Sequence, residues 1–324
     1  MWRAYLLVLL CLSLLGGCNT APDYWTEAKP SQKKILVSFP PLYSFTHAVA
    51  GEDAYVLCML TAQGPHGHDV AATDMLKVNK ADLFIYNGLT LDELFVEKML
   101  REHKNKSILT LNVGEVLNDK HHDLMLHGEG HVHVVGGVEH KHGEHDPHFW
   151  LGPDRAIAMT KIIADKLVAI DPAHETGYRA RMEKYVAELK KLDAEGKTAF
   201  KDKKVKMVTM HEAFGYFADA FDITIVATIQ KTPGLDPDAA SMARLIKVCK
   251  EEKVSIIAVE PQYSETQAKA LQAILQKDGI KASIVTLDPL ETANVAAGKK
   301  FNPDPDFYLK KMRENIAAIV KALP

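Results

Sequence analysis

This sequence has few cysteines, and none of them are spaced as a metal or redox motif requires. The four are Cys11, Cys18, Cys58 and Cys249, and no CxxC pattern occurs. This excludes a thiolate zinc site of the usual spacing and a thioredoxin-like redox site. Cys58 lies in an apolar, strand-like run and Cys249 on a helix-like stretch, so we interpret both as small buried hydrophobic residues. A disulfide between them stays open, because sequence alone does not reveal pairing.

Basic patches, long apolar runs and familiar catalytic motifs are also missing. The formal net charge is −3 and no basic patch occurs, which gives no reason to expect a nucleic-acid partner. No HExxH, nucleophile elbow or P-loop is found. The apolar run over residues 4–15 is too short to span a bilayer as a mature helix. A hydrophobic content of 47% is typical of a globular protein with its own core.

The first 34 residues have the pattern of an export signal followed by a linker. Arg3 precedes the apolar run, and Gly16-Gly17 stand directly before Cys18. The stretch Leu15–Cys18 resembles the lipobox of bacterial lipoproteins, in which the cysteine is lipidated and becomes the mature N-terminus. We therefore expect a signal peptide over residues 1–17, a lipid anchor on Cys18 and a flexible tether over residues 18–34. An ordinary cleaved signal with an incidental cysteine is the alternative.

Beyond the tether, short apolar runs alternate with longer amphipathic ones. We expect strands over residues 35–38, 55–60, 83–86 and 108–111, with helices over 42–50, 73–80 and 91–103. Helical periodicity then covers residues 153–169 and 173–197. A second series follows, with strands over 206–210, 223–227, 254–259 and 282–287 and helices over 211–220, 238–252, 265–277 and 305–323. This alternation predicts parallel sheets covered by helices.

The predicted architecture is α/β, with two parallel-sheet lobes joined by one long interlobe helix. The N-terminal lobe covers residues 35–152 and includes a His-rich loop over 119–147. Helices fill residues 153–197, and the C-terminal lobe covers residues 198–324. The helical run that begins at residue 173 is long for a globular protein. We favour a rigid strut between the lobes over a long surface helix.

The densest chemical feature is a cluster of histidines. Residues 121–148 hold nine of the chain's 15 histidines in a glycine-rich, otherwise polar segment. Neutral imidazole is a common ligand for zinc and its neighbours. We expect weak, exchangeable metal binding by the loop histidines, with a merely solubilising loop as the alternative. These residues are His121, His122, His127, His131, His133, His140, His142 and His145.

Four further side chains stand just after predicted strands or the loop, where open α/β sheets place their binding sites. They are His66, His148, His211 and Asp288, two from each lobe. A cleft between the lobes could gather these three imidazoles and one carboxylate, a donor set that suits tetrahedral zinc. Each residue also has an ordinary alternative role, as a loop histidine, a core histidine, a helix cap or a turn aspartate.

A family resemblance becomes specific at these residues. The segments that carry it are Pro65-His66 with Asp74, Asp146–Pro153, His211–Tyr216, Glu260–Tyr263 and Leu287–Leu290. They resemble, in the same order, the PHxY…D, DPHxWLxP, HxAFxY, EPQ and LDPL motifs of the cluster A-I solute-binding proteins of ABC transporters, in particular the zinc-binding ZnuA- and AdcA-like proteins. Asp171–Tyr178 resembles the start of the family's interlobe helix. The likeness covers nearly the whole chain after the signal and departs at His68, where the family has an aromatic residue.

The resemblance implies a monomer that captures zinc outside the cytoplasm, in the periplasm or at the cell surface. It would deliver the ion to an ABC permease with its ATPase subunit. It carries over His66, His148 and His211 as ligands and Asp288 as the fourth, although some members use water or another carboxylate there. His211 at the third position favours zinc, since glutamate there goes with manganese. Manganese or iron uptake, a zinc hydrolase and an adhesin are the alternatives.

Two residues near these motifs receive supporting roles. His68 is a possible auxiliary ligand, because it takes the place of the family's aromatic residue. Glu260 is expected to orient a ligand histidine through the ring nitrogen that does not face the metal. A surface glutamate that begins a turn is the alternative for Glu260.

Overall fold

The computed structural model describes residues 22–127, 132–135, 138–141, 145–230, 235 and 237–323. The predicted signal peptide and Cys18 lie outside these residues. In the N-terminal half the elements are β1 (Lys33–Val37), α1 (Pro40–Ala50), β2 (Ala54–Cys58), α2 (Ala72–Val78), β3 (Leu83–Tyr86), α3 (Glu93–Glu102), β4 (Leu109–Asn112), α4 (Val113–Lys120), η1 (His122–Leu124), β5 (Val132–Val135), β6 (Val138–Lys141) and η2 (Phe149–Leu151). In the C-terminal half they are α5 (Pro153–Ile170), η3 (Pro172–His174), α6 (Glu175–Phe200), β7 (Lys206–Thr209), α7 (Gly215–Phe221), β8 (Thr224–Thr228), α8 (Ala239–Glu252), β9 (Ile256–Val259), α9 (Thr266–Lys277), β10 (Ser283–Thr286) and α10 (Phe307–Ala322).

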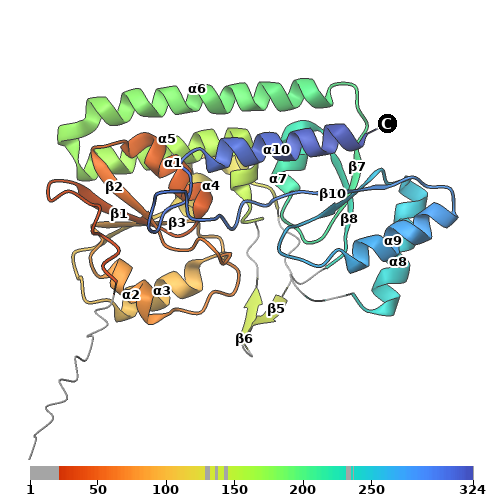
Figure 1. Ribbon diagram of the computed structural model, residues 1–324, viewed down its shortest axis with the longest axis horizontal. Coiled ribbons are helices and arrows are strands. Elements are labelled where there is room, and N and C mark those ends of the chain that lie inside the picture. Colours follow the sequence, from red (N-terminus) through yellow and green to blue (C-terminus); the bar gives the residue numbers. More distant parts are fainter. Residues whose placement is uncertain are drawn as a thin grey trace, which may run out of the picture.

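The N-terminal lobe is built on a parallel sheet with the strand order β2-β1-β3-β4 (Figure 1). Successive strand residues face opposite sides of a sheet. In β1, Ile35 and Val37 therefore pack into the core shared with α1 and α5, while Leu36 packs into a smaller core with α3. Both faces are covered, which explains why Ile35–Val37 of β1 and Leu83–Ile85 of β3 are apolar on both sides of the sheet. The predicted α/β class is confirmed.

The C-terminal lobe repeats this plan with the strand order β10-β9-β7-β8, again parallel. In β9, Ile256 and Ala258 face the same core as β1, whereas Ile257 and Val259 face a separate core under α8 and α9. Figure 1 shows the two sheets side by side with the β5–β6 hairpin below them, between the lobes. The two predicted lobes are therefore present.

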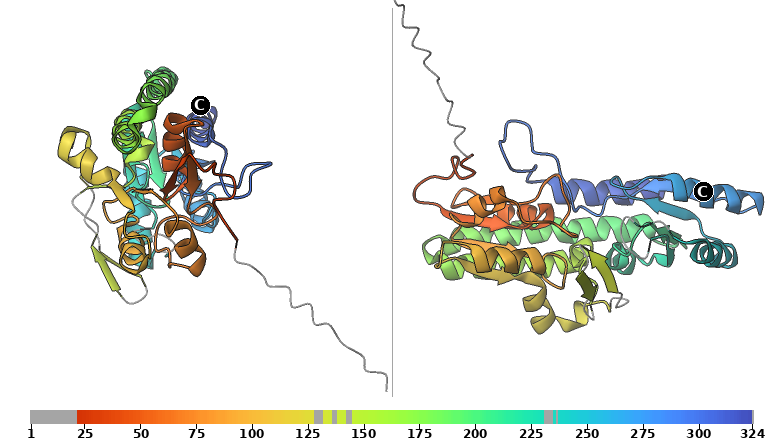
Figure 2. Two further views of the ribbon diagram at one scale, coloured as in Figure 1. Left: turned by 90° about the vertical axis from the view of Figure 1, so that its left-hand side faces the viewer. Right: turned by 90° about the horizontal axis from the view of Figure 1, so that it is seen from below.

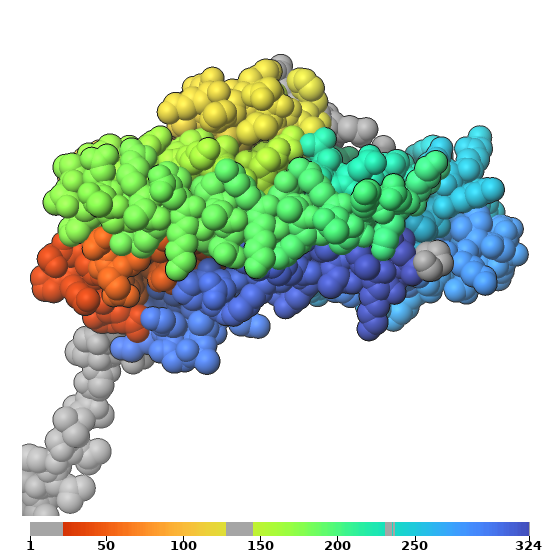
Figure 3. Space-filling model, turned by 90° about the horizontal axis from the view of Figure 1, so that it is seen from above, coloured from red at the N-terminus to blue at the C-terminus, as the bar shows by residue number. Residues whose placement is uncertain are grey.

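A single hydrophobic core runs from one lobe into the other. It joins residues of both sheets to the helices α1, α5, α6, α7 and α10. Helix α6 contacts α1 in the N-terminal lobe and α7 in the C-terminal lobe, and it lies along the upper side of the molecule from one lobe to the other (Figures 1 and 3). The strut interpretation of this helix agrees with its course. Of the helices in the described ranges, none combines the length and the apolar character needed to cross a membrane.

Local structure departs from the sequence expectations in several places. The expected helix over 211–220 begins only at Gly215, so His211 lies in a turn before α7. Two elements were not expected from the sequence. Helix α4 lies directly before the His-rich segment, and the β5–β6 hairpin lies within it. Asn112 explains the extra helix, because its side chain accepts a hydrogen bond from the backbone N–H of Glu115 and caps α4.

The expected tether is not free from residue 22 onward. Trp25 is 4% exposed, and its indole N–H donates to the carbonyl of Lys77 at 3.1 Å. Tyr24 packs against Phe301, which comes from the other end of the chain, with ring centroids 4.7 Å apart. In Figure 2 this segment meets the lobe at one end of the molecule. The prediction of a flexible tether reaching to residue 34 is therefore wrong for this part, because an aromatic side chain fastens it to the lobe.

Cys58 and Cys249 are both free thiols and both buried. Cys58 ends β2 in the N-terminal lobe, while Cys249 lies on α8 in the C-terminal lobe. Burial raises the pKa of the Cys249 thiol to about 11 and also raises that of Cys58, so both stay protonated at neutral pH. The interpretation as small core residues agrees with this, and the disulfide alternative does not.

The contact between Gly196 of α6 and the ring of Phe221 of α7 gives a test of how tightly the strut is packed. A Cβ at Gly196 would overlap that buried ring. We expect Gly196→Ala to lower the free energy of unfolding by about 1–3 kcal/mol through overpacking, measured by urea denaturation. Helix propensity alone predicts the opposite sign, by about 1 kcal/mol. Ala194→Gly on the exposed side of the same helix is the control for propensity, and a stabilised Gly196→Ala variant would contradict the proposed packing.

Candidate metal centre

His66 lies in the loop that follows β2 and is held toward the other lobe. The backbone N–H of Ala293 donates to the carbonyl of Thr61 in this loop at 2.8 Å. Gly67, next to His66, has a φ of 64°, a left-handed conformation that glycine adopts without strain. The His66 side chain is 19% exposed, which is more than the side chains of His148, His211 and Glu291 that lie around it.

His148 lies between the end of the His-rich segment and the short helix η2. Asp146 accepts a hydrogen bond from the backbone N–H of His148 at 2.9 Å and pairs with its Nδ1 at 2.7 Å. The side-chain amide of Asn87 donates to the carbonyl of Pro147 at 3.0 Å and fixes the backbone between them. The ring of Trp150 packs 5.3 Å from that of His148. These contacts leave Nε2 of His148 as the nitrogen directed away from its supports.

His211 follows β7 directly and is almost fully buried. Its Nδ1 pairs with Oε1 of Glu260 at 2.7 Å, and the other oxygen of Glu260 accepts from Gln262 at 2.9 Å. Glu260 follows β9, the neighbour of β7, so the parallel sheet brings both residues to the same edge. The structure thus places Glu260 where the sequence suggested, on the ring nitrogen of a histidine.

The fourth member of the cluster is Glu291, which the sequence reasoning missed. Its Oε1 lies 3.3 Å from Nε2 of His66 and 3.7 Å from Nε2 of both His148 and His211. The Nε2 atoms of His66 and His148 are 3.1 Å apart. The four ligand atoms all lie within 4.8 Å of one another. A tetrahedral zinc site with bonds of about 2.0–2.1 Å has ligand–ligand edges of roughly 3.3 Å, so one ion fits this set after small adjustments.

Asp288, the predicted fourth ligand, lies outside this group. Its Oδ1 accepts from the backbone N–H of Leu290 at 2.8 Å, and its Oδ2 lies 3.7 Å from Lys311. Leu290 has a φ of 66°, and the turn sends Glu291 into the site instead. The physical reason is local: an aspartate before proline readily binds the amide two residues on. That turn signal was present in Asp288-Pro289-Leu290 and pointed away from a ligand role.

His68 is also directed away from the cluster. Its Nε2 pairs with Oδ2 of Asp74 on α2 at 2.9 Å, and its ring packs edge-on against Phe95 at 5.1 Å. The same Asp74 oxygen accepts from the backbone of Ala71. His68 therefore fastens the His66 loop to α2, and it is not placed as the auxiliary ligand that the sequence suggested.

Proteins of zinc-uptake systems resemble this chain in sequence. Residues 35–322 match the family described as "Zinc-uptake complex component A periplasmic", ZnuA. The chain belongs to the ZnuA family. It is 30% identical to the zinc-binding lipoprotein AdcA of Streptococcus pneumoniae, over 97% of this chain and 59% of that protein. It is 26% identical to the high-affinity zinc uptake system protein ZnuA of Bacillus subtilis, over 99% of this chain and 98% of that protein.

Among solved structures, Zn(II)-bound AdcA from Streptococcus pneumoniae superposes with a TM-score of 0.68 at 29% sequence identity. The superposition covers 90% of this chain and 58% of that one. This ZnuA-family chain thus spans about three fifths of the length of AdcA. The two-lobed fold predicted from the sequence is the fold of the family.

Charge in this ZnuA-family site is balanced between imidazoles and carboxylates. Burial alone would lower the pKa of His211, yet the carboxylates of Glu260 and Glu291 raise it to about 10. Burial would raise the pKa of Glu291, but His66 and His211 hold it well below its ordinary value. Burial lowers the pKa of His148 against the opposing effect of Asp146. A divalent cation placed here would meet an ionised carboxylate, and it would compete with a proton for His211.

The loop histidines of this family member fall into two groups. In the first, the ring of His145 lies 5.3 Å from that of His122 and 5.5 Å from that of His127, and His121 stands exposed beside them. In the second, His133 and His140 are paired across β5 and β6. His131 and His142 lie outside the described residues.

The base of the His-rich segment is closed by a side chain from the other lobe. His127 and His145 form an antiparallel bridge. The hydroxyl of Tyr216 on α7 accepts from the N–H of Leu126 at 3.1 Å and donates to the carbonyl of Asp146 at 2.9 Å. Both ends of the segment are therefore attached to α7, which begins four residues after His211.

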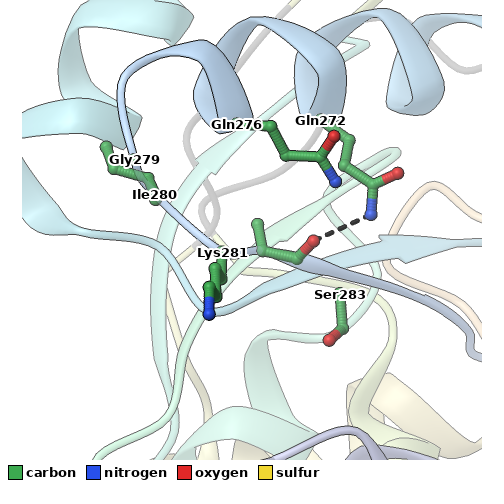
Figure 4. A pocket seen from close by; sticks show the side chains of 7 residues that line it. Gln272, Gln276, Gly279, Ile280, Lys281 and Ser283 are labelled. Carbon is green, nitrogen blue, oxygen red and sulfur yellow. Dashed lines mark hydrogen bonds between the residues drawn. The ribbon is translucent and has the colours of Figure 1, made fainter.

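A separate hollow lies at the far end of the C-terminal lobe (Figure 4). It has a volume of about 500 Å³ and is lined by Gln272, Gln276, Gly279, Ile280, Lys281, Ala282 and Ser283. Gln272 donates to the carbonyl of Ala282 across it at 2.8 Å. The lining comes from α9 and the start of β10, whereas the histidine cluster lies at the other ends of the strands, so the two are unrelated.

The Tyr216 hydroxyl can be tested by hydrogen exchange. Tyr216→Phe removes one acceptor and one donor while keeping the ring. We expect the Leu126 amide to exchange roughly fivefold faster, which corresponds to about 1 kcal/mol for the lost hydrogen bond. Tyr185→Phe is the matched control, because the buried hydroxyl of Tyr185 has no hydrogen-bond partner. Unchanged exchange at Leu126 in Tyr216→Phe would show that the hydroxyl does not hold the segment.

Proposed function

We propose that this protein captures zinc outside the cytoplasm and delivers it to an ABC permease. One observation carries the proposal: four ligand atoms from different parts of the chain lie within 4.8 Å of one another, and the distances from Glu291 Oε1 to the three Nε2 atoms are 3.3, 3.7 and 3.7 Å. Three imidazoles and one carboxylate suit zinc better than manganese, which prefers oxygen donors. Membership of the ZnuA family and the zinc-binding relatives support the same substrate.

In this proposal His66, His148, His211 and Glu291 bind the ion directly. Asp146 and Glu260 hold the rings of His148 and His211 through Nδ1 and present Nε2 to the metal. Such carboxylate–histidine pairs fix the ring orientation and raise the basicity of the ligand. Glu260 directly follows strand β9, and the backbone of Asp146 is held by the Tyr216 hydroxyl, so the donors are in place before the ion arrives.

Transport suits this donor set better than hydrolysis does. Four protein ligands complete the tetrahedral coordination of zinc, whereas catalytic zinc sites keep one position for water. A hydrolase would also need a general base beside that water. Asp146 and Glu260 are paired with the Nδ1 atoms of His148 and His211, on the side of each ring opposite the Nε2 atom that would bind the ion. Neither carboxylate is therefore placed beside a metal-bound water.

The proposed setting follows from the N-terminus. A signal peptide over residues 1–17 would direct export, and a lipid on Cys18 would hold the mature monomer at the outer face of a membrane. The description of the family as a periplasmic component of zinc uptake and the name of AdcA as a lipoprotein support this setting. The partners are the permease and its ATPase subunit, with no nucleic acid.

The His-rich loop serves in this proposal as a weak collector of zinc. Its many imidazoles favour fast, exchangeable binding beside the deeper site. The attachment of its base to Asp146, which also holds His148, keeps the loop next to the proposed route of entry.

The choice of Glu291 over Asp288 gives a direct test. We expect Glu291→Gln to weaken zinc binding by more than the roughly 10–100-fold that follows from loss of an outer-sphere partner. Asp288→Asn keeps the turn acceptor and should change affinity by less than about 0.5 kcal/mol, roughly twofold. Competition with a fluorescent chelator measures both, with thermal melts to confirm folding. Equal losses in the two variants, or none in Glu291→Gln, would refute this ligand set.

The collector role is tested by shortening the loop. The bridge between His127 and His145 allows residues 128–144 to be replaced by a short glycine–serine turn without disturbing the attachment of the base. We expect one tight zinc ion per chain to remain, while additional weaker equivalents fall, as measured by titration calorimetry and elemental analysis. Loss of the tight ion would contradict a collector role and place part of the main site in the loop.

A further inference from the structure

The segment that carries Glu291 belongs to neither lobe alone. Residues 287–306 leave β10 in the C-terminal lobe, run across to the N-terminal lobe and return to α10 (Figure 1, dark blue). The backbone N–H of Ala293 donates to Thr61 in the loop that also holds His66. The position of Glu291 therefore depends on how this crossing segment is attached at each end.

At its first end the segment is held by Asn315 on α10. The Asn315 side chain is 2% exposed. Its Oδ1 accepts from the N–H of Asp288 at 2.9 Å, and its Nδ2 donates to the carbonyl of the same residue at 2.7 Å. One side chain thus satisfies both backbone groups of the residue that begins the turn toward Glu291. Only an amide side chain offers a donor and an acceptor in this arrangement.

At its second end the segment carries its own amide, Asn302, which attaches to the N-terminal lobe. Asn302 is 4% exposed. Its Oδ1 accepts from the N–H of Cys58 at 2.9 Å, and its Nδ2 donates to the carbonyl of Val56 at 3.0 Å. Among the described strands β2 is the edge strand of its sheet, so the N–H of Cys58 and the carbonyl of Val56 have no partner from a neighbouring strand on that side. The Asn302 side chain takes the place of such a strand.

The two attachment points, Asp288 and Asn302, flank Glu291 in the sequence and fix the crossing segment to α10 on one side and to β2 on the other. We propose that Asn302 and Asn315 are positioning residues that hold Glu291 at the ion without touching it. The inference rests on the proposed zinc function and adds a means of retention to it. A ligand must be held to within about half an ångström to keep its contribution, so loosening either attachment weakens the hold on the ion.

The test uses serine substitutions, which remove the paired amide contacts and leave room for water. We expect Asn302→Ser and Asn315→Ser each to raise the rate of zinc dissociation roughly tenfold, the lower end of the range for outer-sphere partners. Stopped-flow chelation of the zinc-loaded full-length protein measures this rate. Asn105→Ser is the matched control, because Asn105 also donates to a backbone carbonyl, that of Ala81, but lies outside the crossing segment.

A double-mutant cycle separates positioning from general destabilisation. In a Glu291→Gln background the two serine substitutions should add almost nothing, because they act through that carboxylate. Equal effects with and without Glu291, or an equal effect of Asn105→Ser, would overturn the inference. If a serine variant does not fold, the aspartate variant at the same position, which keeps the acceptor and places a carboxylate oxygen where the donor was, is measured in its place and judged by the same outcomes.

The outcome also distinguishes this inference from the function on which it rests. If the unmodified protein and Asn105→Ser bind no zinc tightly, the proposed function fails. If both bind zinc and Glu291→Gln weakens that binding while the serine variants match the unmodified protein, only the positioning role fails.

Discussion

The structure depends on one hydrophobic core that passes without interruption from the N-terminal lobe to the C-terminal lobe. Helices α5, α6 and α10 contribute to it along their length, and the inner faces of both sheets pack against it. Separating the lobes would expose apolar surface to water, at a free-energy cost of about 25 cal/mol for each Å². Large hinge opening is therefore costly, and the segments that carry the histidines are held on one common frame. The lobes act as one rigid frame that holds irregular loops at its edge.

Within that frame the loops of the site are fixed by polar side chains that bind backbone. Asn87 holds the carbonyl before His148, Tyr216 holds the two ends of the His-rich segment, and Asn315 holds the turn before Glu291. Buried backbone groups outside helices and strands need such partners. The same contacts that make irregular backbone tolerable in the interior also determine where each donor nitrogen and oxygen lies. Stability and ligand geometry therefore have a common origin here.

The sequence predicted both sheets, the strut and the convergence of three histidines, because these follow from local periodicity and from the rule that parallel strands end at a common edge. The prediction failed where the position of a side chain is determined by a residue far away in the sequence, or by a local hydrogen bond that competes with the metal. Asp288 is engaged by its own turn and by Asn315 27 residues later. His68 is turned away by Asp74, and Trp25 finds its partner 52 residues along the chain. The polar composition around Trp25 predicted a linker, because no residue near Trp25 in the sequence indicates the surface against which it packs.

The position of Trp150 has an optical consequence. Its indole is fully buried, donates to the carbonyl of Pro289 and packs beside the ring of His148, between two of the segments that form the site. The other tryptophan of the described residues, Trp25, is buried on the outer side of the N-terminal lobe. Within the described residues, intrinsic fluorescence therefore has one emitter adjacent to the histidine rings and one in the smaller core of the N-terminal lobe, so the emission of Trp150 can report on events at the proposed site.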